Sequence, residues 1–248
     1  MIITLARRAA VAAVLFGAGF AQMAGAATLA TFGDPWGQRG TVTGAMDAAF
    51  GSGNWTSFAD PGNTAFLAGE SFVYLEGGDR GTDALESFLD TNSTTLLDWI
   101  AGGGSLFVNA APNVGDGLSF GGLTLTRNNF CNSNCNAVDG TSPIFASAGT
   151  SFSGNSFSHA TISGGTGLIT YAGGDILSQI AIGRGSLLMG GMTTTNFHRG
   201  GDPARLRANI LTYGEGLAVA PVPLPAGLPL LVLGLAGLGL VRGRREAS

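Results

Sequence analysis

Residues 94–110 read TTLLDWIAGGGSLFVNA, and this segment indicates the class of fold. Leu96, Leu97 and Ile100 are apolar at helical spacing, and the three glycines at 102–104 are of the kind at which a helix ends. SLFVN then follows as a short apolar run of the kind found in buried strands. A helix joined to a strand by a short glycine link is the unit from which α/β proteins are built.

The same order of helices and strands extends toward the N-terminus. Residues 71–79, SFVYLEGGD, predict a buried strand that ends in acidic and glycine residues, and the apolar positions within 82–101 predict helix. Further upstream, helical spacing within 41–51 lies between strand-like residues 27–36 and 54–60. Strands that alternate with helices through short links predict a parallel sheet in the first half of the domain.

The second half of the domain is richer in strands. Short apolar runs separated by glycine turns predict hairpins at the sheet edge, and they lie at 118–130, 156–165, 167–174 and 176–192. Residues 203–216 return to helical spacing, with Asp202 as the candidate cap and Pro203 in the first turn. The predicted fold class is therefore α/β, a Rossmann/flavodoxin-like and mostly parallel sheet with a β-rich second half.

The N-terminal segment has the pattern of a secretory signal peptide. Arg7 and Arg8 precede an apolar run over residues 9–20, and small residues stand at Ala24 and Ala26. These features predict cleavage after Ala26, so that residues 1–26 are a signal peptide and residues 27–216 an exported domain. A permanent anchor is the alternative, and it is disfavoured because the run is short for a helix that crosses a bilayer.

The C-terminal segment combines three features in a fixed order. A Pro-rich linker at 217–225 precedes an uncharged apolar stretch at 226–241, which predicts a short transmembrane helix, and an Arg-rich tail at 242–248. Basic residues next to a membrane helix stay cytoplasmic, which leaves the domain outside. The motif residues are Val222, Pro223, Leu224, Pro225 and Ala226, and the basic residues are Arg242, Arg244 and Arg245.

This tripartite tail resembles the VPLPA-CTERM sorting signal, a relative of the PEP-CTERM signals. The resemblance implies an exosortase-type membrane transpeptidase as a partner, which would cut near the motif and release or transfer the protein. A plain tail anchor is the alternative. The expected location is therefore either the inner membrane, with the domain facing the periplasm, or the cell surface or exterior after processing.

Charge and cysteine content limit the partners and the chemistry of the domain. Residues 27–220 hold seven Arg and fifteen Asp plus Glu, a net charge of −8, which argues against nucleic acid as a partner. Extracellular polysaccharide is the partner class left open. Cys131 and Cys135 are the only cysteines, and in an oxidising compartment they most simply form a disulfide. A metal site is disfavoured because no further Cys or nearby His completes four ligands.

The order of elements across residues 28–214 resembles the class I glutamine amidotransferase-like fold, including its noncatalytic relatives. The resemblance rests on FVYLEGGD, TTLLDWIAGGGSLFVNA, SPIF, AIGRGSLLMGG and LRANILTY. An active member would carry a Cys nucleophile in a glycine-rich elbow after the central strand. This sequence reads FVNAAPN at 107–113, so neither a thiol nor a hydroxyl occupies that place.

Four polar residues remain as candidates for ligand binding. Asp34, Glu76 and Asp79 follow strand-like segments, where the sheet of an α/β protein places its ligand loops, and they could meet around a cation or a sugar. The competing interpretation is that they are solvated loop carboxylates, since the spacing of a calcium loop is absent. His198 resembles the amidotransferase histidine by position, yet it has no nucleophile to activate. We assign no role to His159.

The sequence therefore favours a noncatalytic exported binding or structural module, with no predicted cofactor, metal or catalytic residue. Two alternatives stay open at this point. One is an extracellular hydrolase of amidotransferase-like fold that uses His198 with Asp34 or Glu76, either directly or through a bound metal. The other is an all-β adhesin rich in Gly, Ser and Thr.

Overall fold

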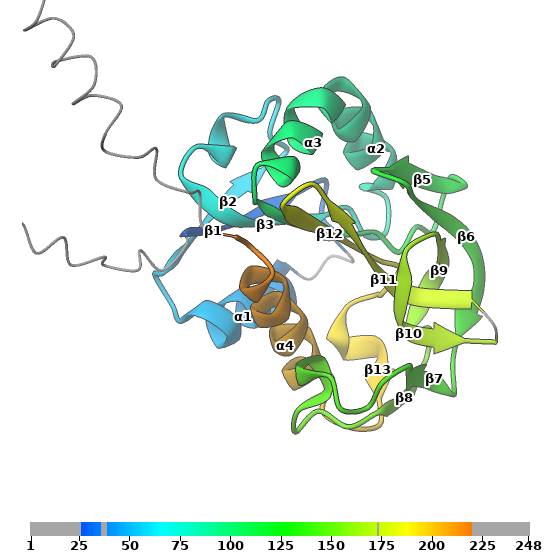
Figure 1. Ribbon diagram of the computed structural model, residues 1–248. Helices are drawn as coiled ribbons and strands as arrows, with labels where there is room; N and C mark the ends of the chain where they lie inside the picture. Colours follow the sequence, from blue (N-terminus) through cyan, green and yellow to red (C-terminus); the bar gives the residue numbers. More distant parts are fainter. Residues whose placement is uncertain (1–25, 36–38, 173, 220–248) are drawn as a thin grey trace, which may run out of the picture.

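A computed structural model describes residues 26–35, 39–172 and 174–219 of the chain (Figure 1). At its centre, five parallel strands lie in the order β2-β1-β3-β4-β12. Their bounds are β1 Ala26–Thr31, β2 Trp55–Ala59, β3 Glu70–Glu76, β4 Ser105–Asn109 and β12 Gly185–Gly190. The predicted parallel sheet of the first half is therefore confirmed.

Within the described residues, four α-helices cover the two faces of these strands. Helices α1 (Arg39–Phe50) and α4 (Pro203–Gly216) lie on one face, and α2 (Thr82–Thr91) and α3 (Ser93–Ala101) lie on the other (Figure 1). The predicted start of α4 is confirmed, because the Asp202 side chain accepts a hydrogen bond from the Arg205 amide at 2.9 Å. These helices also make the all-β architecture of the adhesin alternative wrong.

Helices α2 and α3 divide the region in which the sequence indicated one helical pattern. The break falls at Asn92, whose φ and ψ of −110° and 12° are not helical. The Asn92 side-chain amide donates to the Phe88 carbonyl at 2.9 Å, so that the side chain competes with the helical backbone for this acceptor.

The second half of the sheet is antiparallel. The strands are β5 Gly117–Phe120, β6 Leu123–Cys131, β7 Cys135–Ala137, β8 Ser151–Gly154, β9 Ser158–Ser163, β10 Thr166–Tyr171, β11 Gly174–Ile182 and β13 His198–Arg199, with short 3-10 helices η2 Ala65–Leu67, η3 Pro143–Phe145 and η4 Thr195–Phe197. Every described pair among these strands, and the pair β11–β12, is antiparallel. The sheet is therefore mixed, and the expectation of a mostly parallel sheet holds only for its core. Tight glycine turns such as the one between β11 and β12 leave no room for the crossover that parallel strands require.

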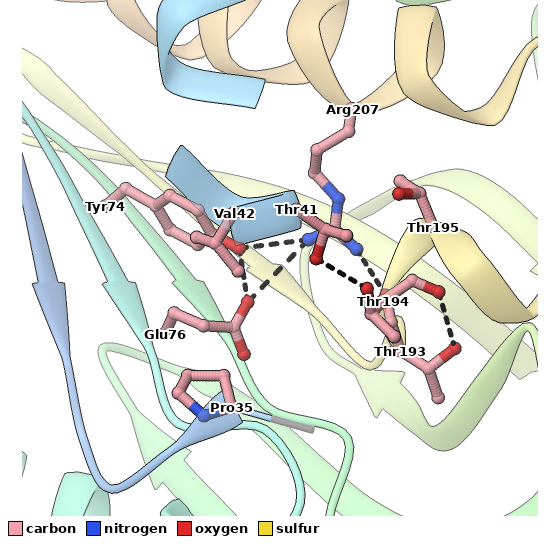
Figure 2. Close-up of a pocket in the computed structure, with 9 residues that line it drawn as sticks. All are labelled: Pro35, Thr41, Val42, Tyr74, Glu76, Thr193, Thr194, Thr195 and Arg207. Atoms are coloured by element: carbon pink, nitrogen blue, oxygen red, sulfur yellow. Dashed lines mark hydrogen bonds and ion pairs between the residues drawn. The ribbon is translucent and has the colours of Figure 1, made fainter. Parts of the chain in front are cut away.

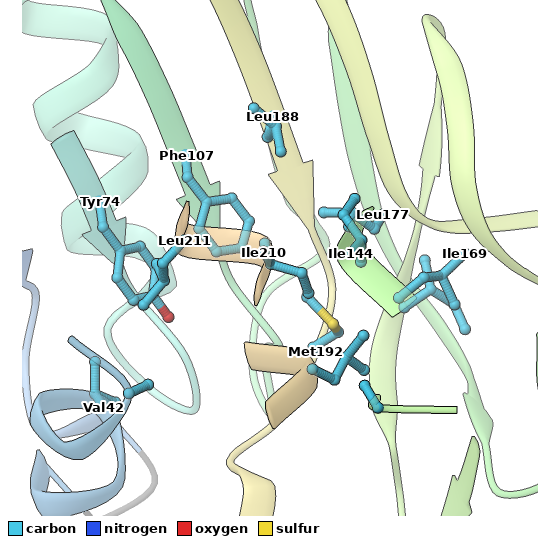
Figure 3. Packing of buried hydrophobic residues seen from close by; sticks show 14 of the residues in the cluster. Val42, Tyr74, Phe107, Ile144, Ile169, Leu177, Leu188, Met192, Ile210 and Leu211 are labelled. Atoms are coloured by element: carbon cyan, nitrogen blue, oxygen red, sulfur yellow. The ribbon is translucent and has the colours of Figure 1, made fainter. Parts of the chain in front are cut away.

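Alternating side chains of the parallel strands build a separate core on each face. Toward α1 and α4, Tyr74 stacks on Phe107 with ring centroids 4.8 Å apart, and both pack near Leu211 of α4 (Figure 3). Toward α2 and α3, Val73 and Leu75 of β3 join a second buried cluster. The apolar run of β3 is therefore continuous because both of its faces are buried.

The predicted disulfide between Cys131 and Cys135 is confirmed. It links the end of β6 to the start of β7, with Cα atoms 6.2 Å apart and both residues fully buried. The predicted signal peptide, apart from Ala26 at its end, and the predicted tail from Val222 onward lie outside the described residues. No helix of residues 26–35, 39–172 and 174–219 is long and apolar enough to cross a membrane.

Candidate functional site

The carboxyl ends of the parallel strands bring polar residues together beside the point where the strand order reverses. The chain passes from β1 outward to β2 and then returns to the other side of β1 with β3. In sheets of this kind, ligands bind outside the carboxyl ends of the strands at such a reversal. Glu76 and Asn109 are the last residues of β3 and β4, and they are partners in the register of the two strands.

Glu76 is buried, and each of its two carboxylate oxygens accepts a hydrogen bond from a protein donor. One carboxylate oxygen, Oε2, accepts from the Tyr74 hydroxyl and from Asn109 Nδ2, the latter at 2.8 Å. The other, Oε1, accepts from the amide of Gly78 at 2.8 Å. Both protons of Asn109 Nδ2 are used as well, because the side chain also donates to the Met192 carbonyl at 2.9 Å, and its Oδ1 accepts from the Met192 amide at 3.1 Å.

Arg207 of α4 completes this network from the opposite layer. Its Nη1 donates to the Tyr74 hydroxyl at 3.0 Å and lies 3.8 Å from Glu76 Oε2, while Nη2 donates to the Thr193 carbonyl at 2.7 Å. Burial raises the pKa of Glu76, and the Arg207 charge opposes that rise. Burial and the Glu76 charge together hold the pKa of Tyr74 well above its ordinary value, so the hydroxyl keeps its proton and donates.

A small cavity lies beside the network (Figure 2). Its volume is about 10 Å³, which is room for about one water molecule. Thr41 of α1 and Thr194 close one side through a hydrogen bond of 2.6 Å between their hydroxyl oxygens. The lining residues are Pro35, Thr41, Val42, Tyr74, Glu76, Thr193, Thr194, Thr195 and Arg207. The place where an α/β sheet would accept a ligand is thus largely filled by side chains.

His198 lies at the same edge but is buried, with 3% of its surface exposed. Its Nε2 is 3.1 Å from Thr193 Oγ1, and that hydroxyl donates to the Ser156 carbonyl at 2.7 Å. A hydroxyl has one proton and the Ser156 carbonyl is its nearest acceptor, so we infer that His198 Nε2 carries a proton and donates to Thr193. Burial is the first cause that lowers the pKa of His198 to about 3, followed by the Arg207 charge, and the imidazole is therefore neutral at pH 7.

The other two sequence candidates, Asp34 and Asp79, do not join the network. Asp34 is exposed, and Asp79 is half-buried and accepts from Asn113 Nδ2 at 2.7 Å. Asp79 also fixes the loop through its backbone, which exchanges hydrogen bonds with Ala111 and Asn113. Within the described part of the chain, no group of three or more His, Cys, Asp or Glu residues could hold a metal ion.

The segment after β4 has no nucleophile. Ala110 and Ala111 are fully buried, and the Ala110 amide donates to the Gly190 carbonyl at 2.9 Å. The backbone of this segment forms hydrogen bonds with β12 and with the loop after β3. Neither alanine has a side chain that could attack a substrate.

Four members of the network were not identified from the sequence: Tyr74, Asn109, Thr193 and Arg207. For two of these residues the sequence contained a feature that indicates a buried polar contact. Tyr74 is two residues from Glu76 and therefore on the same face of the strand. Arg207 shares a helical face with Ile210 and Leu211, and a charge on a buried apolar face requires a buried partner.

No protein-family model matches the sequence, and no curated protein matches it. In fold, the chain is similar to part of three solved β-galactosidases. The enzyme from Bacillus circulans sp. alkalophilus has a TM-score of 0.48 and 12% identity over 78% of this chain and 31% of its own. The enzyme from Rahnella sp. R3 has a TM-score of 0.48 and 14% identity, over 80% of this chain and 33% of its own. Gan42B, a GH42 β-galactosidase, has a TM-score of 0.45 and 10% identity, over 80% of this chain and 31% of its own. The chain thus spans about a third of the length of each enzyme.

Proposed function

We propose that this chain is an exported, noncatalytic module of amidotransferase-like fold, used for binding or for the architecture of the cell envelope. The parallel core supports the fold assignment, because β2-β1-β3-β4-β12 follows the flavodoxin-like order in which the second strand is at the edge and the first lies beside the third. The segments named for the amidotransferase resemblance fall on β3, α3 with β4, η3, β11 with β12, and α4.

The observation that carries the noncatalytic assignment is the buried hydrogen-bonded network at the carboxyl ends of β3 and β4. Catalysis there would require a reactive group, a base within its reach and room for substrate. Alanines follow β4, His198 donates to Thr193 instead of accepting from it, and the cavity holds about one water molecule. Glu76 lines that cavity, but both of its carboxylate oxygens already accept hydrogen bonds from the protein, Oε1 from Gly78 and Oε2 from Tyr74 and Asn109.

Export and sorting form the second part of the proposal, and they rest on the sequence. Cleavage after Ala26 would leave β1 residues 27–31 at the start of the mature chain. The domain would end with α4 before the linker at 217–225, the helix at 226–241 and the Arg-rich tail. The partners that we propose are an exosortase-type enzyme, the membrane through this tail, and extracellular polysaccharide.

Glutamine hydrolysis by the full-length exported protein is the assay that separates this proposal from the hydrolase alternative. We expect no activity above background in the native protein or in His198→Ala. Hydrolysis that disappears in His198→Ala but persists in Asp90→Ala would contradict the noncatalytic assignment, since Asp90 is an exposed residue of α2 outside the candidate site. Measurement of bound transition metal in the same samples tests the metal-dependent form of the alternative.

A further inference from the structure

Strand β2 is the free edge of the parallel core. Among the described residues it pairs only with β1, and its residues from Thr56 to Ala59 are exposed. The connection from β2 to β3 at residues 60–69 contains only the short 3-10 helix η2. Among the described residues, α1 is the helix that contacts β2, and it does so from one face, where Trp55 Nε1 donates to Asp47 Oδ1 at 2.9 Å. A hollow of about 70 Å³ lies beside the strand, next to Ser57 and Ala59, and one of about 280 Å³ lies past its end, between Asp60 and α2.

The outward backbone groups of β2 follow from its pairing with β1. The amide of Asp60 donates to the Thr31 carbonyl at 2.8 Å, so residue 60 faces β1. Alternate residues of a strand direct their amides and carbonyls to the same side. The amides and carbonyls of Trp55, Ser57 and Ala59 therefore face away from the sheet.

This edge lacks the features that usually prevent pairing between sheets. Residues 55–59, WTSFA, include no charged residue and no proline, and their register with β1 is unbroken. The other free edges differ, because β5 packs against α2 and β13 is two residues long. Strand β2 is therefore the part of the described sheet best able to accept another strand.

We propose that two copies of this chain pair through β2, antiparallel, about a two-fold axis at Ser57. In that register Ser57 lies opposite Ser57 of the second copy, and Trp55 lies opposite Ala59. All three positions present outward amides and carbonyls, so each pair exchanges two hydrogen bonds. One residue beyond β2, Asp60 would lie opposite Asn54, which keeps the acidic side chains of the two copies apart.

An aromatic row on the α2 face supports a second copy as the occupant. Phe58 is 43% exposed, although it lies 5.7 Å from Phe66 between ring centroids. The row continues from Phe66 to Phe88 at 6.1 Å and on to Phe32 at 5.1 Å. In the proposed register the two Phe58 side chains are diagonal neighbours across the axis, at about 7–8 Å, within reach of aromatic rings. Pairing would therefore cover the exposed Phe58 side chain of each copy.

Cysteine trapping in the full-length exported protein tests this register. Ser57→Cys would place two thiols opposite each other with Cα atoms about 5.5 Å apart, a separation that a short bifunctional thiol cross-linker spans. Ser119→Cys is the matched control, because Ser119 is an exposed serine on the edge strand β5. We expect a covalent dimer on a nonreducing gel for Ser57→Cys and monomer for Ser119→Cys. Monomer for both, or equal dimer for both, would overturn the register.

The mass of the detergent-solubilised full chain, measured by light scattering, tests pairing without a covalent bond. Ser57→Lys would set two ammonium groups opposite each other, and we expect dimer dissociation to become at least about tenfold more favourable. Ser119→Lys should keep the dimer mass of the unmodified protein. A monomeric unmodified protein, or a Ser57→Lys variant that dimerises as strongly as Ser119→Lys, would contradict the proposal.

Discussion

Replacement of Arg207 by methionine tests how strongly the buried network stabilises the domain. Methionine keeps an unbranched side chain but removes the guanidinium that lies 3.8 Å from Glu76 and donates to Tyr74 and Thr193. Glu76 would become a buried carboxylate without a cation, and breaking a buried pair in this way costs about 3–5 kcal/mol. In a domain of about 190 residues, each kcal/mol lowers Tm by about 2–4 °C, so we expect a fall of roughly 6–20 °C.

The pH dependence of this loss has a definite sign. Burial raises the pKa of Glu76 above its ordinary value of 4.5, and Arg207 restrains that rise. Without Arg207 the pKa of Glu76 rises further. A carboxyl group whose pKa is raised in the folded state contributes stability that is fully present below pH 4.5. This stability is lost as the pH rises through the pKa of the folded state. Arg207→Met should therefore be more destabilising at pH 8 than at pH 5.

A double-mutant cycle with Glu76→Gln isolates the interaction between the two charges. Glu76→Gln alone leaves Arg207 buried without its anion, whereas the double variant has neither charge. The double variant should therefore be more stable than the sum of the single losses predicts, by at least about 2 kcal/mol.

Urea unfolding followed by circular dichroism at pH 5 and pH 8 measures all four proteins. Arg205→Met is the control on the same helix, since Arg205 is exposed, and it should change the free energy of unfolding by less than about 0.5 kcal/mol. The reasoning is refuted if Arg207→Met costs less than about 1 kcal/mol, or if its cost is the same at both pH values and additive with that of Glu76→Gln.

Three further predictions concern other parts of the molecule. Cys131→Ser should cost less than about 3 kcal/mol in urea unfolding, because the disulfide closes a short loop, and a larger loss would show that the bond stabilises more than its own loop. The pKa of His198 is about 3 in the folded state, whereas the ordinary pKa of histidine is 6.5. As the pH falls below 6.5, the unfolded chain gains a proton at this residue and the folded chain does not, so the folded state loses stability. His198→Gln should remove about 2 kcal/mol of the loss between pH 7.5 and pH 5, and an unchanged slope would contradict the neutral buried state. A chain that ends at Ala220 should stay folded and leave the membrane fraction, as fractionation and circular dichroism would report, whereas aggregation would indicate that the tail is required for folding.

Much of the fold could be predicted because its signals are local. The helix at 203–216 was indicated by its apolar spacing and by Asp202 with Pro203 at its start, and the structure has it with those bounds. The glycines at 102–104 correctly indicated the passage from α3 to β4. The parallel core followed from the alternation of strands and helices, because crossover connections impose it.

The candidate site could be predicted only in part because its contacts are distant along the chain. Glu76 was identified from its place after a strand, but its partner Arg207 is 131 positions away in sequence, and nothing local relates the two. His198 was named for its position after a strand, but its burial against Phe157, with ring centroids 4.3 Å apart, joins residues 41 positions apart in sequence and is not encoded in its neighbours. The carboxylates Asp34 and Asp79 share the loops of that edge but do not enter the network.

The mass of the mature protein recovered from the outside of the cell tests the central claim, that this is an exported module delivered by its tail. Expression of the full chain beside an exosortase-type enzyme should yield a product that begins at Ala27 and ends near the motif at 222–226. The same chain with Pro223 and Pro225 replaced by alanine should keep its C-terminus. A mature protein that retains residues 227–248 in the presence of the enzyme, or that never leaves the cytoplasm, would contradict the account.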